Sequence, residues 1–185
     1  MSEAKTTWPV AVFAHNEARN IVACLDSLRA ATGRLTECYV LANACTDRTE
    51  ALVREYSASH SGVHLVSIAL GDKANAWNVF VHEVAPRGAA HYFFIDGDVR
   101  ATPGSLDAMA QALALHPQAN GASALPRSGR GVAAFQRDML KDNGIAGNLY
   151  GLRGSFVERI RAQAIKMPVG TIGEDALMGA MLKWD

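Results

Sequence analysis

Short apolar runs that alternate with segments of helical period constrain the fold of this chain more than any other feature. In the segments between the runs, apolar residues recur every three or four positions, which predicts helices. The predicted strands cover residues 8–14, 37–42, 63–68 and 91–95, and the predicted helices cover residues 20–32, 51–60, 73–85 and a segment that starts near Pro103. This alternation favours an α/β fold, in which a mostly parallel central sheet is flanked by helices on both faces in a three-layer, Rossmann-like arrangement.

The second half of the chain is less regular. Residues 120–126 predict a fifth strand, and residues 131–142 predict a helix whose apolar residues, Val132, Phe135, Met139 and Leu140, face inward. Residues 148–160 are interrupted by glycines and predict no single element. The last pattern is a helix that opens with Glu174 and Asp175, just after Gly173. Because the sequence shows no internal repeat, linker or second domain, we expect a single domain over residues 1–185.

Composition limits the partners and the compartment. Of the 185 residues, 49% are hydrophobic and 19% are charged, and 18 acidic residues balance 18 basic ones, so the chain is globular and has no basic field that would attract a nucleic acid. The apolar stretch near the N-terminus is too short for a membrane span and lacks the basic lead of a signal peptide. Cys24, Cys38 and Cys45 form no CxxC pair, which fits reduced thiols in a cytoplasmic protein. The histidines show no metal-finger spacing, so we expect no structural zinc.

Polar residues follow each of the first predicted strands at its carboxyl end. They form clusters at residues 15–17, 43–47, 71–73 and 96–98. In an open parallel sheet, ligands bind at the carboxyl ends of the strands. We therefore expect these clusters to meet at one edge of the sheet and to form one ligand site.

The cluster at residues 96–98 carries two carboxylates, Asp96 and Asp98, with only Gly97 between them. Both can face one ion, and hard oxygen ligands of this kind suit Mg²⁺ or Mn²⁺ with a substrate phosphate completing the coordination. Acids are also common in turns and near helix starts, so an isolated pair of this kind has an equally simple structural explanation. Its position at the end of a predicted central strand favours the functional interpretation.

Other phosphate and metal motifs fit less well. An EF-hand loop that begins at Asp96 would need glycine at its sixth position and glutamate at its twelfth, where the chain has Ala101 and Asp107. A Walker loop and a GxGxxG fingerprint are absent. A phosphatase with an aspartate nucleophile in DxDx(T/V) remains a minor alternative, although Arg100 occupies the hydroxyl position and the motif follows the fourth strand instead of the first.

The segments FAHNEARNI, VLANACTDRTEALVREY, KANAWN, FFIDGDVR and GEDALMGAML, in this order, resemble the family 2 glycosyltransferases. The resemblance extends from Trp8 to Leu182. Each segment alone is a weak signal, and the ordered set is specific. The resemblance implies the GT-A fold and an enzyme that moves a sugar from a nucleotide-diphospho-sugar donor to a hydroxyl acceptor, which would be a saccharide, a lipid or a small molecule.

The resemblance also implies roles for individual residues. Asn16, Glu17 and the loop from Asn43 to Asp47 would hold the nucleoside of the donor, and Lys73 and Asn78 would lie near its base, ribose or phosphates. Asp98 would bind a divalent metal, Mn²⁺ or Mg²⁺, that bridges the donor diphosphate, with Asp96 directed toward the ribose or the metal. Asp175 would be the general base that deprotonates the acceptor hydroxyl for in-line attack at the anomeric carbon, which implies inversion of configuration.

Several of these residues also have structural explanations. Glu17 and Asp47 are suited to cap helices as well as to bind a ligand, and Asp47 with Glu50 resembles a capping box. Lys73 can be a solvated lysine at a helix start, and Glu174 with Asp175 fits the first turn of any helix. We expect Trp77 and the Met-rich last helix to belong to the core. The glycine-rich segment from Gly144 to Gly154 is expected to border the acceptor site, since small residues let a substrate approach the backbone.

Differences from the family pattern keep alternatives open. The chain has Ala42 and Asn43 where many members carry an aspartate that grips uracil, so the base is undetermined. The QxxRW element of processive synthases is missing, and the chain ends soon after Asp175. It is therefore either a short, non-processive enzyme or a fragment that lacks a C-terminal portion. A nucleotide-sugar binding domain without turnover stays open, as does, more distantly, a nucleotidyltransferase, and the letters alone do not decide whether water is also an acceptor.

Overall fold

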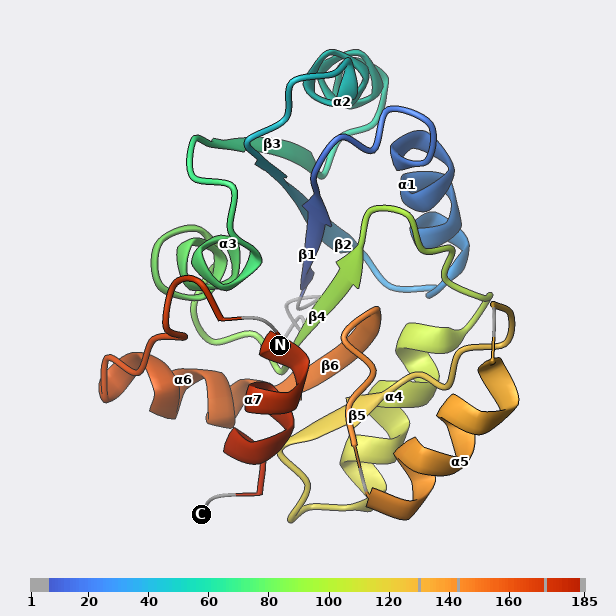
Figure 1. Cartoon of the computed structure of the whole chain (residues 1–185), viewed down its shortest axis with the longest axis vertical. Coiled ribbons are helices and arrows are strands. Elements are labelled where there is room, and N and C mark those ends of the chain that lie inside the picture. Colours follow the sequence, from blue (N-terminus) through green and yellow to red (C-terminus); the bar gives the residue numbers. More distant parts are fainter. Residues whose placement is uncertain (1–6, 130, 143, 172, 184–185) are drawn as a thin grey trace, which may run out of the picture.

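The computed structural model describes residues 7–129, 131–142, 144–171 and 173–183 (Figure 1). Its strands are β1 (Trp8–Ala14), β2 (Thr36–Asn43), β3 (Val63–Ile68), β4 (His91–Asp96), β5 (Gly121–Ser123) and β6 (Leu149–Arg153). Its helices are α1 (Ile21–Ala30), α2 (Thr49–Ser59), α3 (Lys73–Val79), the π-helical turn η1 (Phe80–Val84), α4 (Ser105–Leu115), α5 (Val132–Asp142), α6 (Gly154–Ala162) and α7 (Glu174–Met181).

The strands form one 6-stranded sheet in the order β3-β2-β1-β4-β6-β5. β1 pairs in parallel with β2 and with β4, and β2 pairs in parallel with β3. β6 runs antiparallel to both of its neighbours, β4 and β5, so it is the one reversed strand of this sheet. Central β1 places Val12 beside Val40 of β2 and Ile95 of β4, and all three side chains are fully buried. The sheet is therefore mostly parallel, as the sequence predicts.

Helices cover both faces of the sheet and enclose one apolar core on each side (Figure 1). Along β4 the side chains alternate, so that Phe93 and Ile95 belong to one core and Tyr92 and Phe94 to the other. α1, α2 and α4 pack on the first side, and α3, α6 and α7 pack on the second. Trp77 and the methionines of α7, Met178 and Met181, are buried in the second core, so their predicted place in the core is confirmed.

The helix predicted over residues 73–85 forms as two parts. α3 is followed directly by η1, and the backbone turns away at Ala85, before Pro86. The glycine-punctuated residues 148–160, for which the sequence predicts no single element, form strand β6 and the start of helix α6.

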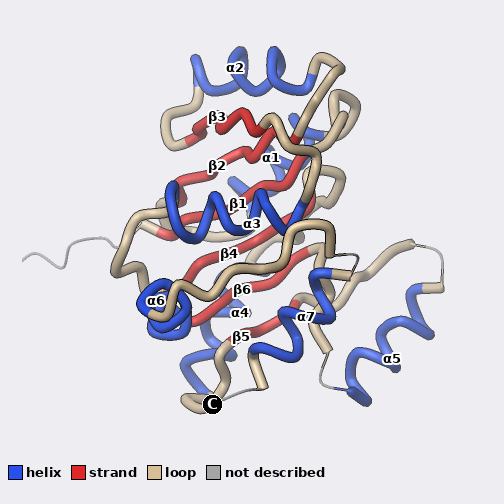
Figure 2. Tube along the Cα trace, turned by 60° about the vertical axis from the view of Figure 1, so that its left-hand side comes forward, coloured by secondary structure: helices blue, strands red, loops and turns tan. Residues whose placement is uncertain are grey.

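The inward orientation predicted for the apolar residues of α5 is wrong in part. Met139 is buried, but Phe135 is 45% exposed and Leu140 is 66% exposed. Figure 2 shows the reason, because α5 is set apart from the sheet. The helical period of the sequence identifies an apolar face, but it does not say whether another element covers that face.

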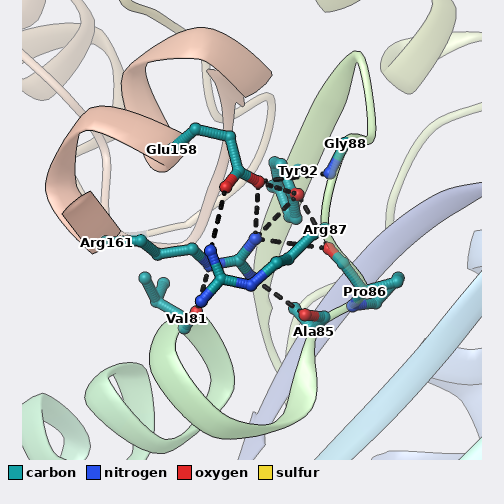
Figure 3. A network of polar contacts seen from close by, with 8 residues as sticks. All are labelled: Val81, Ala85, Pro86, Arg87, Gly88, Tyr92, Glu158 and Arg161. Carbon is teal, nitrogen blue, oxygen red and sulfur yellow. Dashed lines mark hydrogen bonds and ion pairs between the residues drawn. The ribbon is translucent and has the colours of Figure 1, made fainter.

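A buried arginine links α6 to the end of η1 (Figure 3). The Arg161 side chain is 3% exposed, and its guanidinium donates hydrogen bonds to the carbonyl oxygens of Val81 and Ala85 and to Glu158 Oε1, the last at 2.7 Å. Burial raises the pKa of Glu158, but hydrogen bonds from Gly88 N and the Tyr92 hydroxyl, together with the Arg161 charge, outweigh burial and hold this pKa below its usual value. The carbonyls at the end of η1 thus find donors that the helix itself lacks.

No helix in the described part of the chain has the length and apolar character needed to cross a membrane.

Candidate functional site

The polar clusters that follow β1, β2 and β4 meet at the carboxyl edge of the sheet. They surround an open cavity of about 240 Å³, which is lined by Phe13, Ala14, His15, Glu17, Asn43, Lys73, Asp96, Gly97 and Asp98. Of the residues predicted to bind the donor, five line this cavity: Glu17, Asn43, Lys73, Asp96 and Asp98. The sheet edge therefore brings together predicted donor-binding residues that are up to 81 positions apart in the sequence, from Glu17 to Asp98.

Backbone hydrogen bonds fix the turn that carries the two aspartates. Gly97 N donates to the carbonyl oxygen of Phe13 on β1 at 2.7 Å, and Asp96 N donates to that of Asn148 at 3.1 Å. A Cβ atom at Gly97 would lie 3.0 Å from the Phe13 oxygen and 3.3 Å from Ala14 Cβ, so a side chain at this position would be crowded by β1. The turn is therefore held from both sides, with glycine at its point of closest approach.

Asp96 and Asp98 occupy different environments. Asp96 Oδ1 forms an ion pair with Lys73 Nζ at 2.6 Å, and both side chains are partly buried. Asp98 is exposed, and its carboxylate makes no hydrogen bond or ion pair with the residues that the structure describes. Asp98 thus presents an oxygen pair to the cavity, whereas Asp96 is tied to α3.

Asn16 organises the loop that follows β2. It has a left-handed backbone, with φ of 57°, and its Oδ1 accepts hydrogen bonds from the backbone nitrogens of Thr46 and Asp47. Asp47 in turn accepts from Thr49 at the start of α2 and from Ala18 N. The Thr49 hydroxyl, with the backbone N–H groups of Thr49 and Ala18, lowers the pKa of Asp47. Asn16 and Asp47 therefore shape the rim of the cavity without lining it.

The predicted capping interactions are found in part. Asp47 caps the first turn of α2 through Thr49 N, at 2.9 Å. The reciprocal half of a capping box is not formed, because Glu50 pairs with Arg54 at 2.7 Å. Glu17 accepts a hydrogen bond from the Asn20 amide just before α1, and its backbone oxygen accepts from Ile21 N.

Asn43 and Asp72 connect β2 to the start of α3. Asn43 is buried, and its Oδ1 accepts from Asp72 N at 3.0 Å, while its backbone oxygen is 2.6 Å from His15 Nδ1. Asp72 caps α3 by accepting from Asn75 N, and it also accepts from Gly170 N. The position of Lys73 beside Asp96 follows from this cap.

The structure does not bring Asn78 to the cavity, in contrast to its predicted place near the donor. Asn78 is buried, its Nδ2 donates to the Met167 carbonyl at 2.9 Å, and its Oδ1 accepts from Met167 N at 2.8 Å. A side-chain amide that both donates a hydrogen bond to and accepts one from the backbone of the same residue links two segments of the chain. Asn78 therefore holds the segment before α7 against α3.

Asp175, the predicted general base, lies beside the donor cavity. It lines a small hollow of about 10 Å³ together with Phe13, Lys73, Trp77, Gly147 and Tyr150. Phe13 and Lys73 also line the larger cavity, so the two spaces adjoin. A Cβ atom at Gly147 would lie 2.9 Å from Asp175 Cβ, so the absence of a side chain there makes room for the carboxylate. Asp175 also borders a third cavity, of about 480 Å³, between α5 and α7.

Phe13 and Tyr150 line these cavities, but the sequence does not predict them as site residues. Phe13 lies within an apolar strand, and Tyr150 lies in a strand that the sequence did not predict. Only Gly147 had a signal, since it falls in the glycine-rich segment that was expected to border the acceptor.

The carboxylate oxygens at this site fit a divalent cation that binds together with a phosphate-bearing ligand. In the part of the chain that the structure describes, no three histidine, cysteine or acidic side chains are grouped closely enough to hold a metal on their own. Mg²⁺ and similar ions are commonly held by one or two carboxylates and by the phosphates of the substrate. Asp98, exposed and without a protein partner among the described residues, has the chemistry for this, and Asp96 lies beside it.

A sequence model of the family described as glycosyl transferase family 2 matches residues 10–172. A search of curated protein sequences finds no match.

Solved structures share the fold at low sequence identity. A mannosyltransferase from Pyrobaculum calidifontis, in complex with GDP-Man and Mn²⁺, has a TM-score of 0.73 and 23% identity over 94% of this chain and 50% of that one. TarS residues 1–349 from S. aureus, with UDP-GlcNAc, gives 0.70 and 16% over 95% and 53%. Glucosyl-3-phosphoglycerate synthase from Mycobacterium tuberculosis, with Mn²⁺, UDP and glucosyl-3-phosphoglycerate, gives a TM-score of 0.57 and 20% identity over 83% of this chain and 59% of that one. These likenesses assign the GT-A fold, and the chain spans about half the length of these neighbours.

Proposed function

The chain belongs to glycosyl transferase family 2, and we propose that it transfers a sugar from a nucleoside-diphosphate donor to a hydroxyl acceptor with inversion at the anomeric carbon. One observation carries this proposal. An exposed carboxylate suited to a metal, Asp98, and a second carboxylate, Asp175, border adjoining cavities at the carboxyl edge of the sheet, with Phe13 and Lys73 between them.

The donor occupies the cavity of about 240 Å³. Asn43 and Glu17 contact the nucleoside, within the rim shaped by Asn16 and Asp47. Lys73 contributes positive charge near the diphosphate while it holds Asp96 in place. Asn78 acts on this site indirectly, through the segment that it fastens. Two of the neighbours were solved with GDP-Man and UDP-GlcNAc, which supports a nucleotide-sugar donor without fixing its base.

Asp98, with Asp96 beside it, would hold Mn²⁺ or Mg²⁺ together with the donor diphosphate. When bound, such an ion stabilises the negative charge that develops on the departing nucleoside diphosphate. The complexes of two neighbours with Mn²⁺ support this choice of ion.

Asp175 acts as the general base. Its carboxylate takes the proton of the acceptor hydroxyl as the acceptor oxygen forms a bond to the anomeric carbon. On the opposite face, the bond from that carbon to the diphosphate oxygen breaks, and the nucleoside diphosphate leaves with the electron pair. Asp175 is partly buried at the start of α7, and its Oδ1 accepts from Ala176 N at 2.9 Å, which fixes the direction of the carboxylate.

Calorimetric titration with nucleoside diphosphates, with and without Mn²⁺, tests the donor half of the proposal. We expect one nucleotide to bind in a Mn²⁺-dependent way and Asp98→Asn to weaken that binding at least about tenfold, or ~1.4 kcal/mol. Glu55→Gln is the matched control, since Glu55 is an exposed acid on α2 and should leave the affinity unchanged. Absence of nucleotide binding by folded wild-type protein would contradict the proposal.

Release of nucleoside diphosphate from the matching sugar donor, measured with a panel of acceptors, tests the catalytic half. We expect Asp175→Asn to bind the nucleotide like the wild type and to turn over at least about 100-fold more slowly, as expected for loss of a general base. If the wild type binds the donor but no acceptor stimulates release, and Asp175→Asn changes nothing, the chain is a binding domain without turnover.

A further inference from the structure

A hollow on the α4 side of Asp98 has no role in the proposed binding of the donor or in the proposed action of Asp175. It has a volume of about 460 Å³ and lies between the turn after β4, the start of α4 and the segment that follows β5. Asp98 is the residue that it shares with the donor cavity. It is also lined by Asn148, which directly follows Gly147, the residue that faces Asp175. The hollow therefore adjoins the donor cavity at Asp98, and one peptide bond separates its lining from that of the hollow beside Asp175.

The charge of this hollow is positive. Arg100 and Arg127 line it, and neither makes an ion pair or hydrogen bond with the residues that the structure describes. Asp98 is the one acid in its described lining, and a divalent cation bound there would add further positive charge. The cavity between α5 and α7 differs, because it is lined by Asp138 and Asp175 as well as Lys183. Of the two large cavities, only the one beside α4 is suited to an anion.

Besides the two arginines, residues with hydroxyl groups line the hollow. Thr102, Ser105 and Ser128 line the hollow and add polar groups to its wall.

Local contacts hold the two arginine-bearing segments in place before any ligand arrives. Ala101 N, next to Arg100, donates to Ser27 Oγ at 3.0 Å. The carbonyl oxygen of Pro126, next to Arg127, accepts from Gln136 Nε2 of α5 at 2.6 Å. Guanidinium groups on fixed backbone are suited to bidentate recognition of phosphate or carboxylate.

We propose that this hollow binds an anionic group, a phosphate or a carboxylate, carried by the acceptor, so that the acceptor is an acidic hydroxy compound. This inference rests on the proposed transferase function. The acidic group lies between Arg100 and Arg127, and the remainder of the acceptor extends past Asn148 and Gly147, so that its hydroxyl reaches Asp175.

The proposal is tested by titrating the protein, in complex with Mg²⁺ and a nucleoside diphosphate, with matched neutral and anionic compounds. Suitable pairs are glycerol with glycerol 3-phosphate and glucose with glucuronate, and inorganic phosphate is titrated separately into the protein without nucleotide. We expect the anionic member of a pair to bind at least about tenfold more tightly, a preference equal to roughly 1.4 kcal/mol. Arg100→Gln and Arg127→Gln should each abolish most of that preference and weaken inorganic phosphate, whereas Arg54→Gln, an exposed arginine on α2, should do neither.

The arms of this experiment separate the possible failures. Equal binding of neutral and anionic compounds, or binding of neither, would overturn the proposal. If Arg100→Gln and Arg127→Gln weaken the nucleoside diphosphate as much as the anionic compound, the arginines serve the donor, and the proposal is again overturned. A wild type that binds phosphate through these arginines but binds no nucleotide would contradict the transferase function and leave the anion site standing.

Discussion

At the scale of the residue, the site depends on a missing side chain as much as on the side chains present. A methyl group at position 147 would lie 2.9 Å from Asp175 Cβ and 3.3 Å from its Oδ2, closer than such atoms normally approach. The carboxylate would have to move, and displacement of a catalytic group by about 1 Å can cost on the order of 100-fold in rate.

We therefore expect Gly147→Ala to lower kcat/KM by about 100-fold while nucleotide affinity stays close to that of the wild type. Gly144→Ala is the matched control, since a Cβ there would meet its nearest neighbour at 3.8 Å, an ordinary contact. Steady-state kinetics of the three proteins checks this expectation. Equal activity of Gly147→Ala and Gly144→Ala would show that Asp175 does not need this space.

His91, at the start of β4, makes stability depend on pH. Burial, with repulsion from Arg153 and Arg34, lowers the pKa of His91 below its ordinary value of 6.5, and its Nδ1 is buried without a partner among the described residues. As the pH falls through about 6.5, the unfolded chain binds a proton at this histidine that the folded chain does not bind. The free energy of unfolding therefore decreases until the pH drops below the folded pKa.

Urea unfolding at pH 7.5 and pH 5.5 measures this effect. We expect the wild type to lose more stability between these pH values than His91→Phe, which keeps a ring beside Trp8 and Phe93 but cannot titrate. Identical losses in the two proteins would show that other groups cause the dependence.

At the scale of the element, the junction of α3, η1 and α6 relies on the Arg161 network (Figure 3). Arg161→Met would leave the carbonyls of Val81 and Ala85 without this donor and Glu158 without its buried partner. We expect a loss of about 3 kcal/mol in the free energy of unfolding, since leaving a buried carbonyl without its donor costs roughly 1–3 kcal/mol. Arg87→Met is the control, because Arg87 contacts the same glutamate at 3.6 Å but its side chain is 76% exposed, and it should cost no more than about 1 kcal/mol. Similar losses for both variants would contradict a special role for the buried guanidinium.

The helices and strands differ in how well the sequence predicts them. The bounds of β1 and β3 and the polar clusters at the ends of β1, β2 and β4 follow from local pattern, because a buried strand must be apolar and a ligand site must be polar. β6 was not predicted, since its glycines weaken the strand pattern. Gly151 is required there because a Cβ would lie 2.8 Å from the ring of Phe93, a contact between strands that no local pattern reveals. The uncovered face of α5 and the Met167 partner of Asn78 likewise depend on tertiary contacts.

At the scale of the whole molecule, the two cores share one sheet, and we expect them to unfold together. Trp8 lies in one core and Trp77 in the other, so each reports on one side of β4. In proteins that retain only one of these two tryptophans, with Trp184 replaced as well, fluorescence midpoints in urea should coincide with each other and with that from circular dichroism. Separate midpoints would contradict the single domain that we propose for residues 1–185.

The reversed direction of β6 has a consequence for how such a chain can diversify. β5 ends and β6 begins at the same edge of the sheet, and Ala124 N donates to the carbonyl oxygen of Leu149 at 3.0 Å, so the intervening segment with α5 leaves and returns at one point. Its closure is local, and the entropic cost of lengthening a closed loop grows only slowly with its length. The connection between β5 and β6 can therefore be replaced or lengthened without altering the register of the sheet. Because it carries Arg127 and ends next to Gly147 and Asn148, we expect such an exchange to change the proposed acceptor specificity and to leave binding of the proposed donor unchanged.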